Sequence, residues 1–180
     1  MKRLVAALVL AAAPAAAETW EFCWQGSGGW EMFGRMEVVE GAPDFIDQTH
    51  VTDFYIAGFL DGAPMGSWQL GDRTPRTSWH LRFDRVSGQF PTGGLRPDGA
   101  DYQAWNAGGS ADDCGIPGFG FNAGNNAQDV CVDGQWRTDS MVERETPFPA
   151  YRDSLPFDCP AVPLLGSDAD AIDRAIRARY

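Results

Sequence analysis

The sequence predicts an all-β fold, an antiparallel β-sandwich or squat barrel with a short C-terminal α-helix. Apolar and polar residues alternate along several segments, which is the period of a strand with one buried face. Clusters of Gly, Pro, Asp and Asn separate these segments at short intervals, as expected of turns between antiparallel strands. A helical spacing of apolar residues is found near the C-terminus, at Ile172, Ile176 and Tyr180.

The first two strands are expected on either side of a Gly-rich turn. Residues 19–25 place Trp20, Phe22 and Trp24 on one face, and the alternation resumes at residues 30–38 after the turn at 26–29. The pattern predicts a hairpin. Further strands are expected at residues 49–60, 65–70, 78–83, 101–106 and 117–122, with two more within 128–145, and residues 83–90 have the composition of a tight hairpin turn.

The tail of the chain differs in composition from the strand region. Residues 146–166 are rich in proline and show little periodicity, which predicts an extended strap across the domain. Ser167 is suited to cap a following helix, and Asp170 lies in its first turn, where a negative charge is favourable. We therefore expect a β domain at 18–145, with the strap and helix of 146–180 packed on it.

Residues 1–17 have the features of a signal peptide. Lys2 and Arg3 precede an apolar run that ends at Ala13, and small residues follow up to Ala17. The apolar run is too short to span a bilayer as a helix. We expect cleavage after Ala17, a periplasmic or secreted location, and no integral membrane span after cleavage; a retained N-terminal anchor is the alternative.

The charge of the chain restricts its partners. It contains 14 Lys and Arg residues against 25 Asp and Glu residues, a formal net charge of −11. Loss of Lys2 and Arg3 with the signal peptide makes the balance more acidic and leaves no lysine. An acidic surface repels phosphate backbones and anionic lipid headgroups. We expect no nucleic-acid partner, and a partner that is an extracytoplasmic ligand or protein.

The four cysteines predict two disulfide bonds, because export places thiols in an oxidising compartment. Cys114 and Cys131 flank one Gly- and Asn-rich loop, while Cys23 and Cys159 lie near opposite ends of the chain. We expect the nested pairing, Cys114 with Cys131 and Cys23 with Cys159, although four cysteines allow three connectivities. A zinc site is the competing interpretation, and the absence of a C-x-x-C pair argues against it.

No catalytic, cofactor or metal residues are assigned from the sequence. His50 and His80 are the two histidines, and no serine lies in a G-x-S-x-G elbow. A Ser/His/Asp site or a carboxylate pair for glycoside hydrolysis could assemble only through the fold. No cofactor is expected, although Asp112, Asp113, Asn125, Asn126 and Asp129 offer oxygen ligands that suit a structural calcium ion.

Seven tryptophans raise the question of ligand stacking. Trp20, Trp24, Trp30 and Trp79 fall on apolar faces and are expected in the core. The pattern constrains the position of three other tryptophans less, so a ligand role stays open for them: Trp68, Trp105 and Trp136. The loops at 93–99, 108–120 and 123–128 are the expected binding elements, since binding residues are concentrated on loops of rigid scaffolds.

The segment from Val51 to Phe90 carries a family resemblance. Its elements are Phe54-Tyr55-Ile56, Gly66-Ser67-Trp68 and Phe83-Asp84-x-x-Ser87-Gly88-x-Phe90. In these it resembles a β-rich module of uncharacterised secreted bacterial proteins, some of which carry C-terminal sorting signals of the PEP-CTERM type. The resemblance implies an all-β fold and no activity. The missing catalytic signals favour a non-catalytic binding or envelope-associated β module; the alternative is an extracytoplasmic hydrolase of glycosides or esters.

Overall fold

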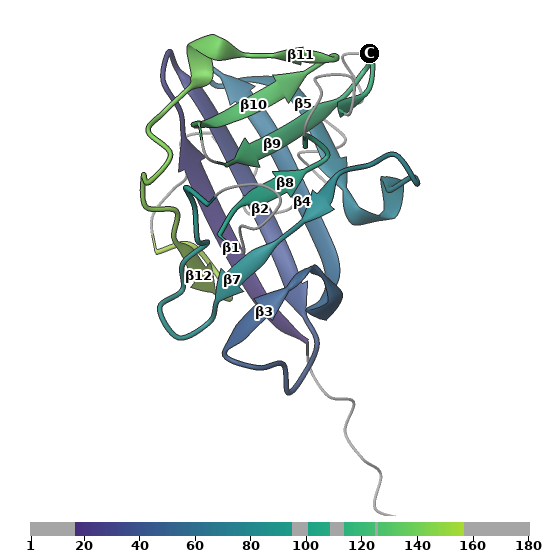
Figure 1. Cartoon of the computed structure of the whole chain (residues 1–180), viewed down its shortest axis with the longest axis vertical. Coiled ribbons are helices and arrows are strands. Elements are labelled where there is room, and N and C mark those ends of the chain that lie inside the picture. The colour runs from purple at the N-terminus through teal and green to yellow at the C-terminus, as the bar shows by residue number, and fades with distance from the viewer. Residues whose placement is uncertain (1–16, 95–100, 109–113, 125, 157–180) are drawn as a thin grey trace, which may run out of the picture.

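The computed structural model describes residues 17–94, 101–108, 114–124 and 126–156. These residues form an all-β structure in which two antiparallel five-stranded sheets pack face to face, with a third sheet of two strands at one end. Figure 1 shows the long strands of the first sheet as one layer and the shorter strands of the second sheet crossing in front of it. The expected antiparallel sandwich is confirmed, whereas the expected C-terminal helix lies outside the described residues.

The first sheet contains the longest strands of the described chain. Its order is β12-β1-β2-β4-β5, and β1 and β2 form the hairpin expected around residues 26–29. Trp20, Phe22 and Trp24 of β1 alternate with other residues and reach the core, whereas β4 is buried continuously from Phe54 to Phe59. Its strands are β1 (Glu18–Gln25), β2 (Trp30–Val38), β4 (Val51–Leu60), β5 (Ala63–Gln69) and β12 (Ala150–Arg152).

The second sheet is built from short strands in the order β11-β10-β9-β8-β6. Apolar side chains of β8, β9 and β10 are buried against the first sheet. The strands are β6 (Trp79–His80), β8 (Gln103–Trp105), β9 (Phe119–Ala123), β10 (Gln128–Val132) and β11 (Gln135–Trp136).

A small sheet of β3 (Phe45–Asp47) and β7 (Arg82–Asp84) lies at the lower end in Figure 1. Three 3₁₀ turns lie wholly within the described residues: Gln48–His50, Leu70–Asp72 and Thr138–Ser140. No helix among the residues described above is both long and apolar enough to cross a membrane.

The core between the sheets is aromatic, and its close packing requires glycine in the first sheet. Phe22, Phe90 and Trp105 are almost fully buried, with ring centroids 4.9–5.4 Å apart. A Cβ atom on Gly58 of β4 would lie 1.9 Å from the ring of Phe119 on β9. Gly58 therefore allows the two layers to approach, because its backbone takes the space that a side chain would fill.

Several predicted boundaries are wrong for local physical reasons. The strand expected at 49–60 begins at Val51, because residues 48–50 form a 3₁₀ turn capped by Asp47. The strand expected at 78–83 is two strands in different sheets, separated at the buried Leu81. Part of the strap, residues 150–152, pairs with β1 as an edge strand, and β3 was not predicted.

The predicted disulfide between Cys114 and Cys131 is confirmed, with an S–S distance of 2.05 Å and 17 residues of separation. It packs with Ala107 and the half-buried Trp136 in a small apolar cluster beside the second sheet. Cys23 is also disulfide-bonded, while its expected partner Cys159 lies outside the described residues. Among the cysteines of the described chain none is free.

Candidate functional site

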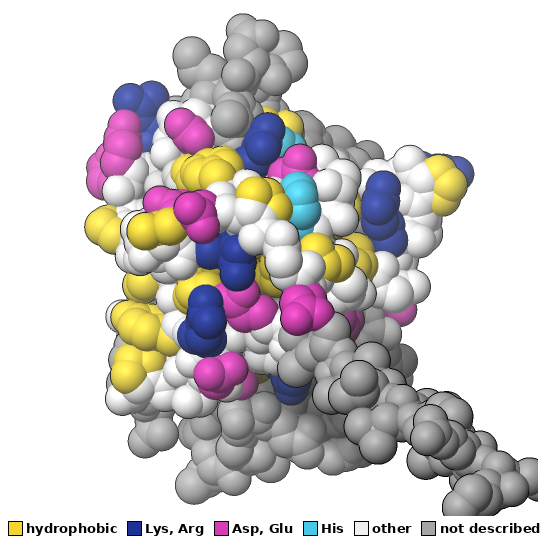
Figure 2. Space-filling model, turned by 90° about the horizontal axis from the view of Figure 1, so that it is seen from below, with side chains coloured by type: hydrophobic (Ala, Val, Ile, Leu, Met, Phe, Trp, Pro, Cys, Tyr) yellow, Lys and Arg dark blue, Asp and Glu magenta, His cyan; other side chains and the backbone are white. Residues whose placement is uncertain are grey.

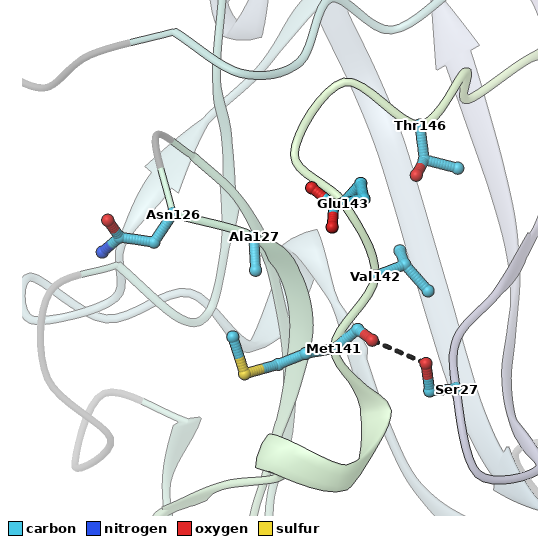
Figure 3. Close-up of a pocket in the computed structure, with 7 residues that line it drawn as sticks. All are labelled: Ser27, Asn126, Ala127, Met141, Val142, Glu143 and Thr146. Carbon is cyan, nitrogen blue, oxygen red and sulfur yellow. Dashed lines mark hydrogen bonds between the residues drawn. The ribbon is translucent and has the colours of Figure 1, made fainter.

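A pocket of about 450 Å³ opens where the β1–β2 turn, the loop before β10 and the segment after the last 3₁₀ turn come together. Figure 3 shows Met141, Val142 and Glu143 projecting from one extended segment, with Ser27 on one side and Asn126 on the other. The volume lies in the range of small-molecule sites. The lining consists of Ser27, Asn126, Ala127, Met141, Val142, Glu143 and Thr146.

Gln128, the first residue of β10, organises one wall of this pocket. Its side chain is fully buried, and its amide group donates hydrogen bonds to the carbonyls of Arg144 and Thr146 at 3.3 and 2.6 Å. Its backbone exchanges two hydrogen bonds of 3.1 Å with Val142. One buried amide residue thus fixes the segment 142–146 against the second sheet.

Ser140 and Ser27 fix the opposite wall. The hydroxyl of the buried Ser140 accepts a hydrogen bond from the N–H of Val130 and donates one to the carbonyl of Arg137. The Ser140 carbonyl accepts from the N–H of Ser27 at 3.0 Å. The Ser27 hydroxyl donates to the carbonyl of Met141 at 2.6 Å, which is the dashed contact in Figure 3. Both walls of the pocket are therefore held by hydrogen bonds that need no ligand.

The charge in the pocket is negative. Glu143 is the charged residue of the lining, and its neighbour Arg144 is paired instead with Glu145 at 2.5 Å. Met141 is 40% exposed and presents an apolar side chain to the same space. The pocket thus combines a carboxylate, an amide and hydroxyl groups with aliphatic and thioether surface.

His50 has a structural role in the 3₁₀ turn. Its Nδ1 lies 3.0 Å from Asp47 Oδ1 and 3.4 Å from Thr49 Oγ1, and it accepts from the Asp47 N–H. A catalytic triad needs the two ring nitrogens to face different partners, base on one side and nucleophile on the other. In His50 all three contacts involve Nδ1. They belong to a capping box at the start of the 3₁₀ turn. Hydrogen bonds lower the pKa of Asp47. The largest contribution comes from Thr49, and His50 adds a smaller one.

His80 stacks on Tyr102, with ring centroids 3.9 Å apart and an interplanar angle of 13°. The tryptophans left open to a ligand role are not at the pocket. Trp68 and Trp105 are 5% and 0% exposed and pack in the core. Trp136 packs against the disulfide cluster.

The suggested calcium ligands fall mostly outside the described residues. Asp112, Asp113 and Asn125 lie outside the described residues, Asn126 lines the pocket, and the carboxylate of Asp129 accepts a hydrogen bond from the Asn122 amide at 3.4 Å. Within the described part of the chain, no three His, Cys, Asp or Glu side chains are grouped as a metal site would require. The structural calcium ion therefore stays an expectation.

The lower end of the sandwich carries acidic and basic side chains next to one another, as Figure 2 shows. Glu18 makes ion pairs with both Arg85 and Arg152, and Arg82 lies 3.9 Å from the carboxylate of Asp47. Mixed charges of this kind neutralise one another locally.

Comparison with known proteins identifies no relative. No model of a protein family matches the chain, and no curated protein or solved structure matches it significantly. The family resemblance of residues 51–90 consequently stays an expectation, and the candidate site depends on its own geometry.

Part of this site could be predicted from the sequence. The loop at 123–128 was expected to bind a partner, and it contributes Asn126 and Ala127. Ser27, Met141, Glu143 and Thr146 were missed, because they come from a turn and an irregular segment without periodic pattern. No local pattern in the sequence marks Gln128 and Ser140 as the buried residues that they become in the structure.

Proposed function

We propose that this protein is a non-catalytic binding module that works outside the cytoplasm, and that the pocket lined by Ser27, Asn126 and Glu143 is its ligand site. The observation that carries the proposal is a pocket whose walls are fixed by the buried side chains of Gln128 and Ser140. A pre-formed pocket binds without the entropic cost of ordering its walls. The lining holds no histidine or cysteine to act as a catalytic base or nucleophile.

Export to an oxidising compartment is the second part of the proposal. The disulfide between Cys114 and Cys131 supports it, because structural disulfides persist mainly in such compartments. The signal-like residues 1–17 agree with the same location. An exported scaffold that presents one small pocket fits a binding or envelope-associated role.

The chemistry of the lining selects the kind of ligand. Glu143 supplies a negative charge without a basic counterpart among the lining residues, and the whole chain is acidic. Met141 and Val142 supply apolar contact. A small ligand with a cationic head and a short aliphatic body complements both features, whereas an anion of the same shape is repelled by Glu143.

Isothermal titration with hexylammonium and hexanoate tests this proposal. These probes share an aliphatic chain and differ in the sign of their charged head. We expect binding of hexylammonium only, with affinity reduced at least several-fold in Glu143→Gln. Glu145→Gln is the matched control, because Glu145 is adjacent but pairs with Arg144 outside the pocket. Equal binding of both probes, or no binding of either, would contradict the proposal.

A further inference from the structure

The outer face of the first sheet, opposite the core, carries an apolar cluster. Phe33 of β2 and Tyr55, Ala57 and Phe59 of β4 form it. The register pairs Phe33 with Ala57, so these side chains share one face, while the core-facing side chains alternate with them. This sheet therefore has apolar surface on both sides, which is unusual for an antiparallel sheet with one face on the core.

The members of this cluster are covered. Phe33 is 1% exposed, Tyr55 7%, Ala57 0% and Phe59 5%. In the part of the chain that the structure describes, the half-buried apolar side chains packed against them are those of Cys23 and Leu155. A cysteine and a leucine are too small to bury three aromatic rings by themselves, which favours a further covering element.

The course of the chain points to the identity of that element. After β12, the N–H of Leu155 donates to the carboxylate of Glu21 at 3.2 Å. Glu21 of β1 is opposite Arg35 of β2, and both residues lie on the outer face of the sheet. The chain thus crosses onto this face immediately before residue 157. Cys23, on the same face opposite Phe33, is disulfide-bonded.

We propose that residues 157–180 of this same chain are the occupant of the outer face, with the apolar stripe Ile172, Ile176 and Tyr180 laid on Phe33, Tyr55 and Phe59. The expected helix at 167–180 would be about 21 Å long at the usual rise per residue. Five strands at the usual spacing give a sheet of about 19 Å between its edge strands. The segment is long enough to cover the cluster and carries apolar residues on one side.

The face would otherwise be an exposed apolar patch on a secreted protein, and such patches mark interaction surfaces. With residues 157–180 on this face, the first sheet would be the middle one of three layers. It also leaves the pocket as the place where a ligand meets the molecule, because the second apolar surface is already occupied. The proposed disulfide between Cys23 and Cys159 would hold the start of this cover against the sheet.

Photo-crosslinking of the full chain tests the proposal. The photoreactive residue p-benzoylphenylalanine replaces Tyr55 in one variant and Phe59 in a second, and mass spectrometry maps the crosslinked peptide. A one-to-one mixture of nitrogen-14 and nitrogen-15 protein separates crosslinks within one chain from those between copies. We expect crosslinks within one chain to peptides of 157–180. Crosslinks between copies, or none to this segment, would overturn the proposal.

A matched pair of double variants provides an independent readout. Ile172→Asp with Ile176→Asp places charge on the apolar stripe, whereas Ala171→Asp with Ala178→Asp adds the same charge on the opposite side of the expected helix. We expect several-fold more binding of the apolar dye anilinonaphthalene sulfonate to the first variant and no change for the second. Equal dye binding by both would contradict an apolar contact through Ile172 and Ile176.

Discussion

The indole N–H of Trp24 on β1 donates a hydrogen bond of 2.9 Å to the side-chain carbonyl of Gln128 on β10, across 104 residues of sequence. The bond joins the two sheets inside the core, where both side chains are almost fully buried. The amide end of the same Gln128 holds the carbonyls of Arg144 and Thr146 at the pocket. Gln128 therefore couples the packing of the sheets to the shape of the candidate site.

Replacing Gln128 by leucine should destabilise the protein strongly. The substitution keeps a similar volume but leaves the Trp24 N–H and the Thr146 carbonyl without their partner. Unsatisfied buried polar groups cost about 1–3 kcal/mol each, so we expect a loss of roughly 3 kcal/mol in urea denaturation. The same change at the exposed Gln135 of β11 is the control and should alter stability by less than about 0.5 kcal/mol. Similar losses at both positions would argue against the role of Gln128.

Gly58→Ala should be among the most damaging small substitutions. Its Cβ would overlap the Phe119 ring, which is fully buried and cannot move away without opening the core. Overpacking of this kind costs about 1–3 kcal/mol and at times more. Gly71→Ala is the control, since its Cβ would meet nothing within 4 Å. Thermal melting of the two variants compares them, and an unchanged midpoint for Gly58→Ala would show that the layers are further apart than described.

Glu21 should make stability depend on pH. Burial raises the pKa of its carboxyl. The hydrogen bond from Leu155 and the charge of Arg35 lower this pKa by less than burial raises it. The folded state therefore binds the proton more tightly than the unfolded state, so stability falls as pH rises from the ordinary glutamate pKa through the raised one. Glu21→Gln removes this loss and should be more stable than the parent at pH 7, with the difference vanishing in acid.

Denaturation curves measured from pH 3 to pH 8 check this expectation. Glu40→Gln, at an exposed position, controls for the removal of one negative charge. A Glu21→Gln protein less stable than the parent at pH 7 would mean that the hydrogen bond from Leu155 and the attraction by Arg35 outweigh the burial of Glu21.

The disulfide between Cys114 and Cys131 should contribute roughly 3 kcal/mol, the value for closing a loop of about this length in the chain-entropy account. The double variant Cys114→Ala with Cys131→Ala keeps the apolar character of the cluster beside Trp136 and removes the crosslink. We expect a lower denaturation midpoint with an otherwise native far-ultraviolet dichroism spectrum. An unchanged midpoint would mean that packing alone stabilises this region.

Strong periodicity made most of the fold predictable from the sequence. The hairpin of β1 and β2 follows from the alternation of Trp20, Phe22 and Trp24 around a glycine turn, because a half-buried strand imposes that pattern. The strands β3 and β12 were not predictable in this way. Each has three residues, too few to show a period, and each pairs with a partner distant in sequence.

The candidate site was less accessible to sequence reasoning than the fold. Trp105 offered a large aromatic surface next to loops, but its ring is needed to fill the core between the sheets. The pocket instead uses side chains from three irregular segments, which are joined by hydrogen bonds of Gln128 with Thr146 and of Ser140 with Ser27. Hydrogen bonds between residues so far apart leave no local pattern in the sequence.

The methyl resonances of methionine test the central claim, a ligand site at Met141, most directly. In a titration of carbon-13-methyl-labelled protein with hexylammonium, the Met141 methyl signal should shift and saturate, because this side chain lines the pocket. Met32 and Met36, fully buried in the core, serve as internal controls and should stay in place. A Met141 signal that does not move, or equal shifts at Met32 and Met36, would contradict the account.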